Sequence, residues 1–185
     1  MTRTRLLYLA AAALAAAALV LPLWGITMSA PQYPDESLHL EITRTGITGD
    51  VREIETLQKY VGVRFPTELP ELTWATRGIL ALSAILAIGA LVGGNGAGRW
   101  YRRTSAAAFV IFLIASAAVV QFRLYEVGHE RDPHAPLRSI RDFTPPLVGP
   151  TRVGNFTVWS FPHAGGVTLV LSAALAVAGA ARRNA

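Results

Sequence analysis

Cysteine is absent from the 185 residues of this chain, which excludes disulfides, thiolate metal ligands, iron–sulfur clusters and a thiol nucleophile. Charge is also scarce, because Asp, Glu, Lys and Arg make up only 16% of the residues, whereas 52% are hydrophobic. The chain has no Gly-x-Ser-x-Gly elbow and no His-Glu-x-x-His motif, and its glycine-rich stretch at 93–98 lacks the lysine of a phosphate-binding loop. The sequence therefore predicts that the protein is not an enzyme.

Four long stretches of mostly apolar residues are present instead. Each has about the 17–20 residues that a hydrocarbon core of roughly 30 Å demands of a helix. None carries an ionisable residue at its centre, which argues against an ion channel or a proton pump. We expect an all-α membrane bundle of four transmembrane helices, with a small mixed α/β outer (periplasmic) domain built from two loops. The expected helices are 6–24, 72–94, 105–122 and 164–181.

The formal net charge is +5, and the positions of the charges indicate a lipid bilayer rather than nucleic acid as the partner. Seven arginines and no acidic residue lie before the first stretch, in the 95–104 loop and after the last stretch, whereas all 12 acidic residues lie within 35–71 and 126–142. Cytoplasmic loops of membrane proteins are enriched in Lys and Arg. We therefore expect a multi-pass protein of a bacterial inner membrane with both termini cytoplasmic. The outer segments, 25–71 and 123–163, would then face the periplasm.

The N-terminal stretch has a second interpretation. Its basic start, its core of Ala and Leu and the small residue Ala30 also fit a cleaved signal peptide. The apolar stretch is longer than most signal cores, and Met28-Ser29-Ala30 makes a poor cleavage site, so a retained helix is favoured. The two outer segments keep their places under either interpretation.

Small residues recur at about one-turn spacing in the second and fourth stretches. Such residues let helix backbones approach closely in lipid, so we expect helix–helix contacts there. The abundance of Ala and Gly would also produce such pairs by chance. The pairs are Ser83 with Ala87 and Gly89 with Gly93, and the fourth stretch offers Ser172, Ala176, Gly179 and Ala180.

The first outer segment has the pattern of a strand, a turn and a short helix. Apolar and polar residues alternate over 38–43, as in a half-buried strand. Asp50 stands three residues before Glu53, which is typical of a helix start with Asp50 as the N-cap. The helix would end at Gly62 and would turn one apolar side toward the second outer segment, since neither segment can bury a core alone. That side consists of Val51, Ile54, Leu57 and Val61, and its expected partners are Phe156 and Val158.

The second outer segment is rich in proline, which fixes a backbone angle and removes a hydrogen-bond donor. We therefore expect rigid, irregular chain, apart from a strand over 153–161 that its Val, Phe, Thr and Trp residues favour. The prolines are Pro133, Pro136, Pro145, Pro146, Pro150 and Pro162.

All four histidines of the chain lie in the outer segments, and three of them could share a metal ion. His129 and His134 flank Pro133 among carboxylates, and His163 lies where the second outer segment re-enters the membrane. Neutral imidazoles beside a carboxylate suit Cu(II), Zn(II) or Ni(II), and Met28 could add a thioether for Cu(I). These three histidines and Met28 are therefore the candidate metal ligands, with copper as the expected metal. The alternative is that the histidines are solvated loop residues.

Six short motifs in the outer segments carry a resemblance to known proteins. They are Pro31-Gln32-Tyr33-Pro34, Gly49-Asp50-Val51-Arg52-Glu53-Ile54, Tyr60-Val61-Gly62, Asp132-Pro133-His134-Ala135-Pro136, Phe143-Thr144-Pro145-Pro146-Leu147 and Asn155-Phe156-Thr157-Val158-Trp159. They resemble small bacterial four-helix membrane proteins associated with copper handling and with accessory functions for nitrous-oxide reductase. The resembled pattern has Asn-His where this chain has Gln58-Lys59, so a histidine ligand at that place is missing here.

We expect, on these grounds, an integral membrane accessory protein whose periplasmic domain assists copper handling or the maturation of a metalloenzyme. Its partner would be a periplasmic or membrane protein. The alternative is a structural or assembly subunit without metal, which docks a partner through the same outer domain.

Overall fold

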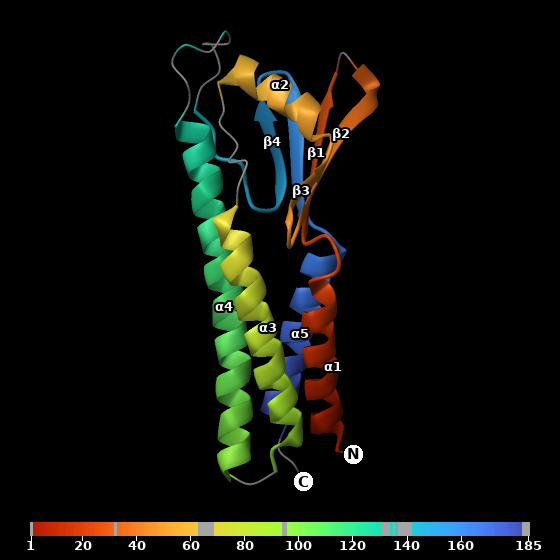
Figure 1. Cartoon of the computed structure of the whole chain (residues 1–185), viewed down its shortest axis with the longest axis vertical. Helices are drawn as coiled ribbons and strands as arrows, with labels where there is room; N and C mark the ends of the chain where they lie inside the picture. The colour runs from red at the N-terminus through yellow and green to blue at the C-terminus, as the bar shows by residue number, and fades with distance from the viewer. Residues whose placement is uncertain are drawn as a thin grey trace.

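The computed structural model describes residues 2–31, 33–62, 69–93, 96–130, 134, 136 and 142–182. Within these residues the chain forms five helices and five strands, arranged as a helical bundle with a sheet at one end (Figure 1). The helices are α1 (Arg3–Ala18), α2 (Val51–Val61), α3 (Pro70–Leu91), α4 (Gly96–His129) and α5 (Ala164–Ala181). The strands are β1 (Trp24–Ala30), β2 (Tyr33–Thr43), β3 (Gly46–Gly49), β4 (Gly149–Val153) and β5 (Phe156–Pro162).

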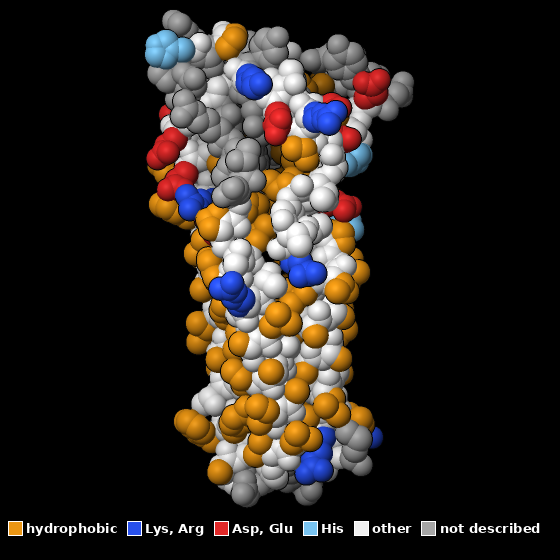
Figure 2. Space-filling view, viewed as in Figure 1, with side chains coloured by type: hydrophobic (Ala, Val, Ile, Leu, Met, Phe, Trp, Pro, Cys, Tyr) orange, Lys and Arg blue, Asp and Glu red, His pale blue; other side chains and the backbone are white. Residues whose placement is uncertain are grey.

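The bundle contains the candidate membrane spans. Among the described residues, three helices are long and apolar enough to cross a membrane, namely α3, α4 and α5. On the face seen in Figure 2, apolar side chains cover most of the bundle, whereas Asp and Glu side chains gather at the sheet end of the molecule. The length and composition of these helices are those of membrane spans. The two termini of the chain lie at the end of the bundle away from the sheet, together with the end of α3 and the start of α4 (Figure 1).

The expected all-α bundle of four transmembrane helices is wrong, first, in the number of spans. Helix α1 ends at Ala18 and has 16 residues. At the helical rise per residue it is about 24 Å long, which is short of the roughly 30 Å of a hydrocarbon core. The apolar stretch continues to Trp24, but Pro22 cannot donate a helical hydrogen bond, and Trp24 already begins β1. The hydrophobic pattern thus runs across a change from helix to strand.

The expectation is wrong, second, in calling the fold all-α. In the described chain, a five-stranded antiparallel sheet dominates the part beyond the bundle, in the order β3-β2-β1-β5-β4. The strand expected over 38–43 lies within β2, and the one expected over 153–161 is divided between β4 and β5. The division is a two-residue turn in which Gly154 has φ 61°, a conformation that favours glycine. The central strand β1 was not expected, because it continues an apolar stretch.

The helices α1, α3, α4 and α5 approach one another closely, with α1 packed mainly against α5 and α3. The ring of Tyr8 is fully buried between Gly89 of α3 and Gly179 of α5, where added Cβ atoms would lie 2.7 Å and 2.8 Å from the ring. The Ser172 hydroxyl donates a buried hydrogen bond of 2.7 Å to the carbonyl oxygen of Ala11. The expected helix contacts at Gly89, Ser172 and Gly179 are therefore confirmed.

The sheet is joined to the bundle through its two central strands. The chain runs from α1 into β1 and from β5 into α5, and both the two strands and the two helices are neighbours. The backbone N–H of Gly165 donates to the carbonyl of Pro22 at 2.8 Å, and that of His163 donates to Leu23 at 3.2 Å. A Cβ atom at Gly166 would lie 2.5 Å from the carbonyl oxygen of Leu23, so only glycine fits there. These contacts fix the height and orientation of the sheet on the bundle.

One face of the sheet, which we call the packed face, lies against α2. The expected burial of Ile54 is confirmed, and Val158 packs on the same apolar cluster. The side chain of Leu57 lies outside the described residues, and Phe156 is half-buried and is not a member of the described cluster. The cluster consists of Ile26, Leu40 and Ile54, with Trp24, Leu38, Ile42, Ile47, Val51 and Val158 packed against it.

Asp50 stands at the start of α2, but its side chain does not form the expected capping box. The carbonyl oxygen of Asp50 accepts a hydrogen bond from the backbone N–H of Ile54, as at an N-cap. Its carboxylate instead accepts a hydrogen bond of 2.8 Å from the backbone N–H of His39, and its own N–H donates to the His39 carbonyl at 2.9 Å. Asp50 therefore ties the start of α2 to strand β2.

Candidate binding surface on the outer sheet

Two of the predicted metal ligands lie at the outer end of α4, where His129 is the last residue of the helix and His134 follows five residues later. The Nδ1 atom of His129 lies 2.9 Å from the carbonyl oxygen of Tyr125, and its ring stacks on the Tyr125 ring with 3.9 Å between centroids. This arrangement makes Nδ1 the donor and leaves Nε2 as the nitrogen that could bind a metal. His134 is exposed, and Asp132, expected as its carboxylate neighbour, lies outside the described residues.

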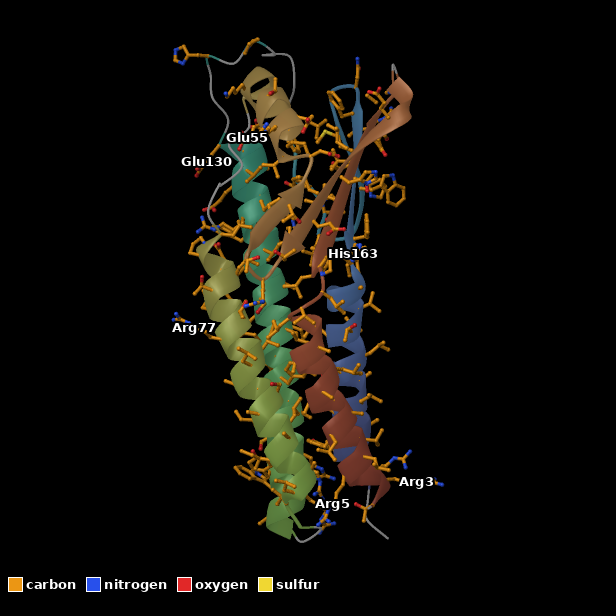
Figure 3. All side chains as sticks on the ribbon, turned by 45° about the vertical axis from the view of Figure 1, so that its right-hand side comes forward. Arg3, Arg5, Glu55, Arg77, Glu130 and His163 are labelled. Atoms are coloured by element: carbon orange, nitrogen blue, oxygen red, sulfur yellow. The ribbon has the colours of Figure 1, made fainter. Side chains whose placement is uncertain are left out.

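The other two predicted ligands lie on opposite faces of the sheet. Met28 pairs with Leu38 and Val158, so its side chain is on the packed face. His163 follows β5 and lies near Glu41, whose side chain is on the opposite face. Glu130, which follows His129, lies on the other side of the molecule from His163 (Figure 3). The described residues contain no group of three or more His, Asp or Glu side chains that could hold a metal ion. The structure therefore does not bring Met28 and His163 together.

The face of the sheet opposite α2 is accessible to solvent, and we call it the open face. The strand register places Thr27 of β1 between His39 of β2 and Trp159 of β5. The side chain of Trp159 is 50% exposed, and that of Phe161, two residues further along β5, is 37% exposed. The open face consists of Thr27, Ser37, His39, Glu41, Arg152, Thr157, Trp159 and Phe161.

His39 is held on the open face by both of its ring nitrogens. Its Nε2 atom lies 2.8 Å from the hydroxyl of Ser37, and its Nδ1 atom lies 3.3 Å from the hydroxyl of Thr27. Its backbone is held by the two hydrogen bonds to Asp50. Because hydroxyls can donate or accept, these neighbours accommodate either neutral tautomer of the imidazole.

Phe161 lies across the strand from Gly25. A Cβ atom at Gly25 would be 2.7 Å from the Phe161 ring, so the absence of a side chain lets the ring lie flat on β1. His163 is next to this ring, with 6.3 Å between ring centroids, and its Nε2 atom is 3.7 Å from Oε1 of Glu41. That contact is an ion pair only when His163 is protonated. An aromatic ring, an imidazole and a carboxylate thus share the end of the open face nearest the bundle.

Sequence patterns reveal only part of this surface. The alternation over 38–43 already separates His39 and Glu41 from the apolar side of β2. Trp159 lies in a segment with strand character, but only the pairing of β5 with β1 places it level with His39. That pairing joins segments from the two ends of the chain, and no local pattern encodes it.

The open face combines exposed aromatic side chains with hydroxyl, imidazole and carboxylate groups. Exposed aromatic side chains supply contact area, and the polar groups around them supply hydrogen bonds and charge. Its histidines contact hydroxyls, a carboxylate and a ring, and its residues include no cysteine or lysine nucleophile. Comparisons with protein-family models, with curated proteins and with solved structures find no match for this chain.

Proposed function

We propose that the protein is a membrane-anchored accessory subunit that docks a protein partner through the open face. The observation that carries this proposal is the exposed pair Trp159 and Phe161 on β5, beside His39 and Glu41. Tryptophan is among the residues that dominate the binding energy of protein interfaces, where a polar rim surrounds an aromatic centre. The open face has this arrangement.

The attachment of the sheet to the bundle supports the same proposal. Because β1 and β5 continue into α1 and α5, the aromatic pair keeps a fixed position above the bundle. A surface that is already ordered loses less conformational entropy when a partner binds. The hydrogen bonds that hold His39 reduce this cost further.

The test is to compare the size of the native complex in membranes for the wild type and for Trp159→Ser and Phe161→Ser. We expect the larger assembly to be lost or reduced in both variants. Val148→Ser is the matched control, because Val148 is 59% exposed in the outer part but is not on the open face. An assembly that tolerates both open-face variants would contradict the docking proposal.

We further propose that the bundle lies in a bacterial inner membrane with the sheet on the periplasmic side. The N-terminus, the C-terminus and the 95–104 segment together hold seven arginines and no acidic residue. The described ends of these segments lie together at one end of the bundle (Figure 1). Positive loops favour the cytoplasm, which puts both termini there. Reporter enzymes fused after Gly62 and after Pro150 should be active only if they require the periplasm. Activity of a cytoplasmic reporter at either place would contradict the proposed orientation.

The resemblance of the outer motifs supports a partner in a copper pathway, such as a metalloenzyme under maturation. Copper bound directly by this chain is a second candidate, favoured by the His163–Glu41 pair, since imidazole and carboxylate ligands suit Cu(II). A copper titration of the wild type, His163→Ala, His129→Ala and His134→Ala tests it. We expect only His163→Ala to weaken binding, because the other two lie elsewhere. Equal binding by all four proteins would show that His163 does not bind copper, and the proposal of a copper-binding partner would be the better one.

A further inference from the structure

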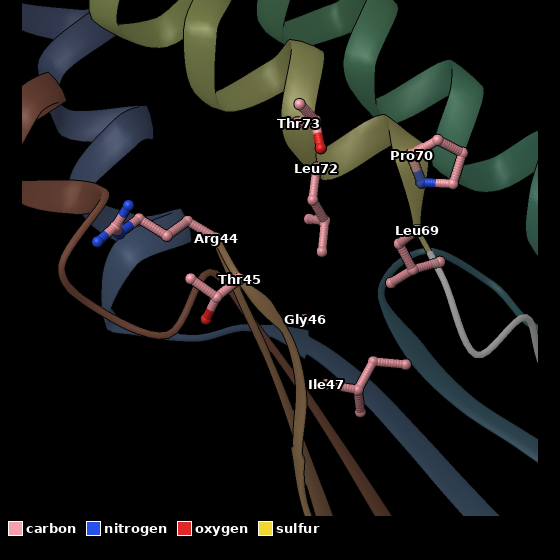
Figure 4. Close-up of a pocket in the computed structure, with 8 residues that line it drawn as sticks. All are labelled: Arg44, Thr45, Gly46, Ile47, Leu69, Pro70, Leu72 and Thr73. Carbon is pink, nitrogen blue, oxygen red and sulfur yellow. The ribbon is translucent and has the colours of Figure 1, made fainter.

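A groove of about 420 Å³ lies where the outer sheet meets the membrane helices. It separates the turn between β2 and β3 from the first turn of α3 (Figure 4). Its main lining residues are Arg44, Thr45 and Ile47 on one side and Leu69, Leu72 and Thr73 on the other.

The groove is polar at its rim and apolar at its floor. The rim residues Arg44, Thr45 and Thr73 are exposed and offer a guanidinium group and two hydroxyls. The floor is formed by half-buried aliphatic side chains, from Ile47, Leu69 and Leu72. Such a site suits a ligand that is charged at one end and aliphatic at the other.

The position of the groove points to the source of that ligand. Helix α3 begins at Pro70 and is one of the candidate membrane spans, so the groove lies beside the outer end of that candidate span. A phospholipid presents its phosphate, its ester oxygens and the first methylenes of its chains at the end of a membrane span.

The local charge favours an anion. No described residue forms an ion pair with Arg44, whereas Glu71, the acid in the first turn of α3, is bound by Arg123. Arg77 lies one turn beyond Thr73 and projects outward from α3 (Figure 3). Arg44 is therefore the cation of the groove lining, and the carboxylate of Glu71 is already paired with another arginine.

We propose that this groove binds the headgroup region of an anionic phospholipid. The guanidinium of Arg44 binds the phosphate, the hydroxyl of Thr73 donates to a phosphate or ester oxygen, and the floor contacts the first methylenes. An Arg–phosphate contact can form two parallel hydrogen bonds, which gives it both strength and orientation. This site is independent of the docking role of the open face.

The test is native mass spectrometry of the full chain in detergent with phosphatidylglycerol or phosphatidylcholine. We expect the wild type to retain phosphatidylglycerol preferentially and Arg44→Gln to bind it about fivefold more weakly, as for the loss of one arginine near an anionic surface. Arg52→Gln is the matched control, since Arg52 is an exposed arginine of α2. Thr73→Val, which keeps the shape of the side chain, should cause a smaller loss.

Three results would overturn the proposal. Equal retention of the two lipids would show that the groove does not select an anion. Equal phosphatidylglycerol binding by the wild type and Arg44→Gln, with both proteins monodisperse, would remove Arg44 from the site. Displacement of the lipid by millimolar inorganic phosphate would show that the groove takes free phosphate rather than a lipid.

Discussion

Helix α5 of the bundle and the outer sheet place their large apolar side chains in opposite ways. Every buried residue of α5 is Gly, Ala or Ser, and its larger residues Val170 and Leu171 are more than half exposed. In the sheet and α2, by contrast, the buried cluster consists of the large residues Ile26, Leu40 and Ile54. The same chain thus follows two packing rules in regions that share β1–α1 and β5–α5 connections.

The difference reflects the two solvents. Lipid tails are as apolar as Leu, so burying a large side chain between membrane helices gains little, and close backbone approach and hydrogen bonds hold the helices together. The sheet lies beyond the candidate spans, where removal of apolar surface from water is the main driving force. Added volume should therefore damage the bundle, whereas lost volume should damage the outer part.

The largest effect is expected from Leu40→Ala in the sheet. Leu40 is 5% exposed, and its truncation should lower the free energy of unfolding of the outer part by about 2–5 kcal/mol. Leu80→Ala on the outside of α3, where Leu80 is 49% exposed, should change it by less than about 0.5 kcal/mol. Denaturant unfolding in detergent, followed by tryptophan fluorescence, measures both. Similar losses in the two variants would show that burial of Leu40 in the outer part does not stabilise the fold.

The next effect is expected from adding a single methyl group in the bundle at Gly89. The new Cβ would lie 2.7 Å from the ring of Tyr8, and such overpacking typically costs about 1–3 kcal/mol. Gly93→Ala is the control, because no atom of the structure lies within 4 Å of a Cβ there. Thermal unfolding in detergent should show a lower midpoint for Gly89→Ala only. A stabilised Gly89→Ala would mean that the helices can move apart at no cost.

Asp50→Ala tests how α2 is held on the sheet. Loss of its hydrogen bond to the backbone of His39 should cost about 0.5–1.5 kcal/mol. Glu53→Ala should have almost no effect, because Glu53 is exposed and a capping box is not formed. Amide hydrogen exchange of α2 and β2 reports the difference. Equal destabilisation by the two variants would indicate that Asp50 and Glu53 form the capping box.

The smallest effect is expected from Ser172→Ala. Its hydroxyl donates to Ala11 between α5 and α1, and hydrogen bonds between membrane helices average about 0.6 kcal/mol. Ser116→Ala is the control, since the Ser116 hydroxyl bonds within α4, to Phe112. A loss of several kcal/mol for Ser172→Ala would show that hydrogen bonding, rather than close packing, holds the bundle.

Local sequence patterns predicted the elements in which one hydrophobic pattern runs along the whole element. The alternation over 38–43 and the helical spacing after Asp50 correspond to β2 and α2, and the expected helices 72–94, 105–122 and 164–181 correspond to α3, α4 and α5. The expected boundaries of the third helix were wrong, because α4 already begins at Gly96, within the expected 95–104 loop, and continues to His129. Strand β1 escaped prediction because its apolar residues continue those of α1, and only Pro22 marks the boundary.

The candidate surface was less predictable, because its residues are brought together by strand register. His39 and Trp159 become neighbours only through Thr27 of β1, which pairs with both. The histidines singled out in the sequence are near one another along the chain or near the membrane ends, but Met28 and His163 are separated by the sheet itself. A one-residue difference in register would exchange the two faces, and the sequence of one strand does not fix that choice.

The pairing of β1 with β5 also sets the order of events during synthesis. Trp24 of β1 donates a side-chain hydrogen bond to Ser160 of β5, a residue 136 positions later in the chain. At about 5–20 residues per second, the ribosome needs roughly 7–27 s to make the intervening segment. During that interval, the edge of β1 that pairs with β5 has no partner strand. Strand β5 can pair with β1 only when α3 and α4 have brought the chain back to the end of the bundle where β1 lies, so closure of the sheet depends on the correct placement of both helices.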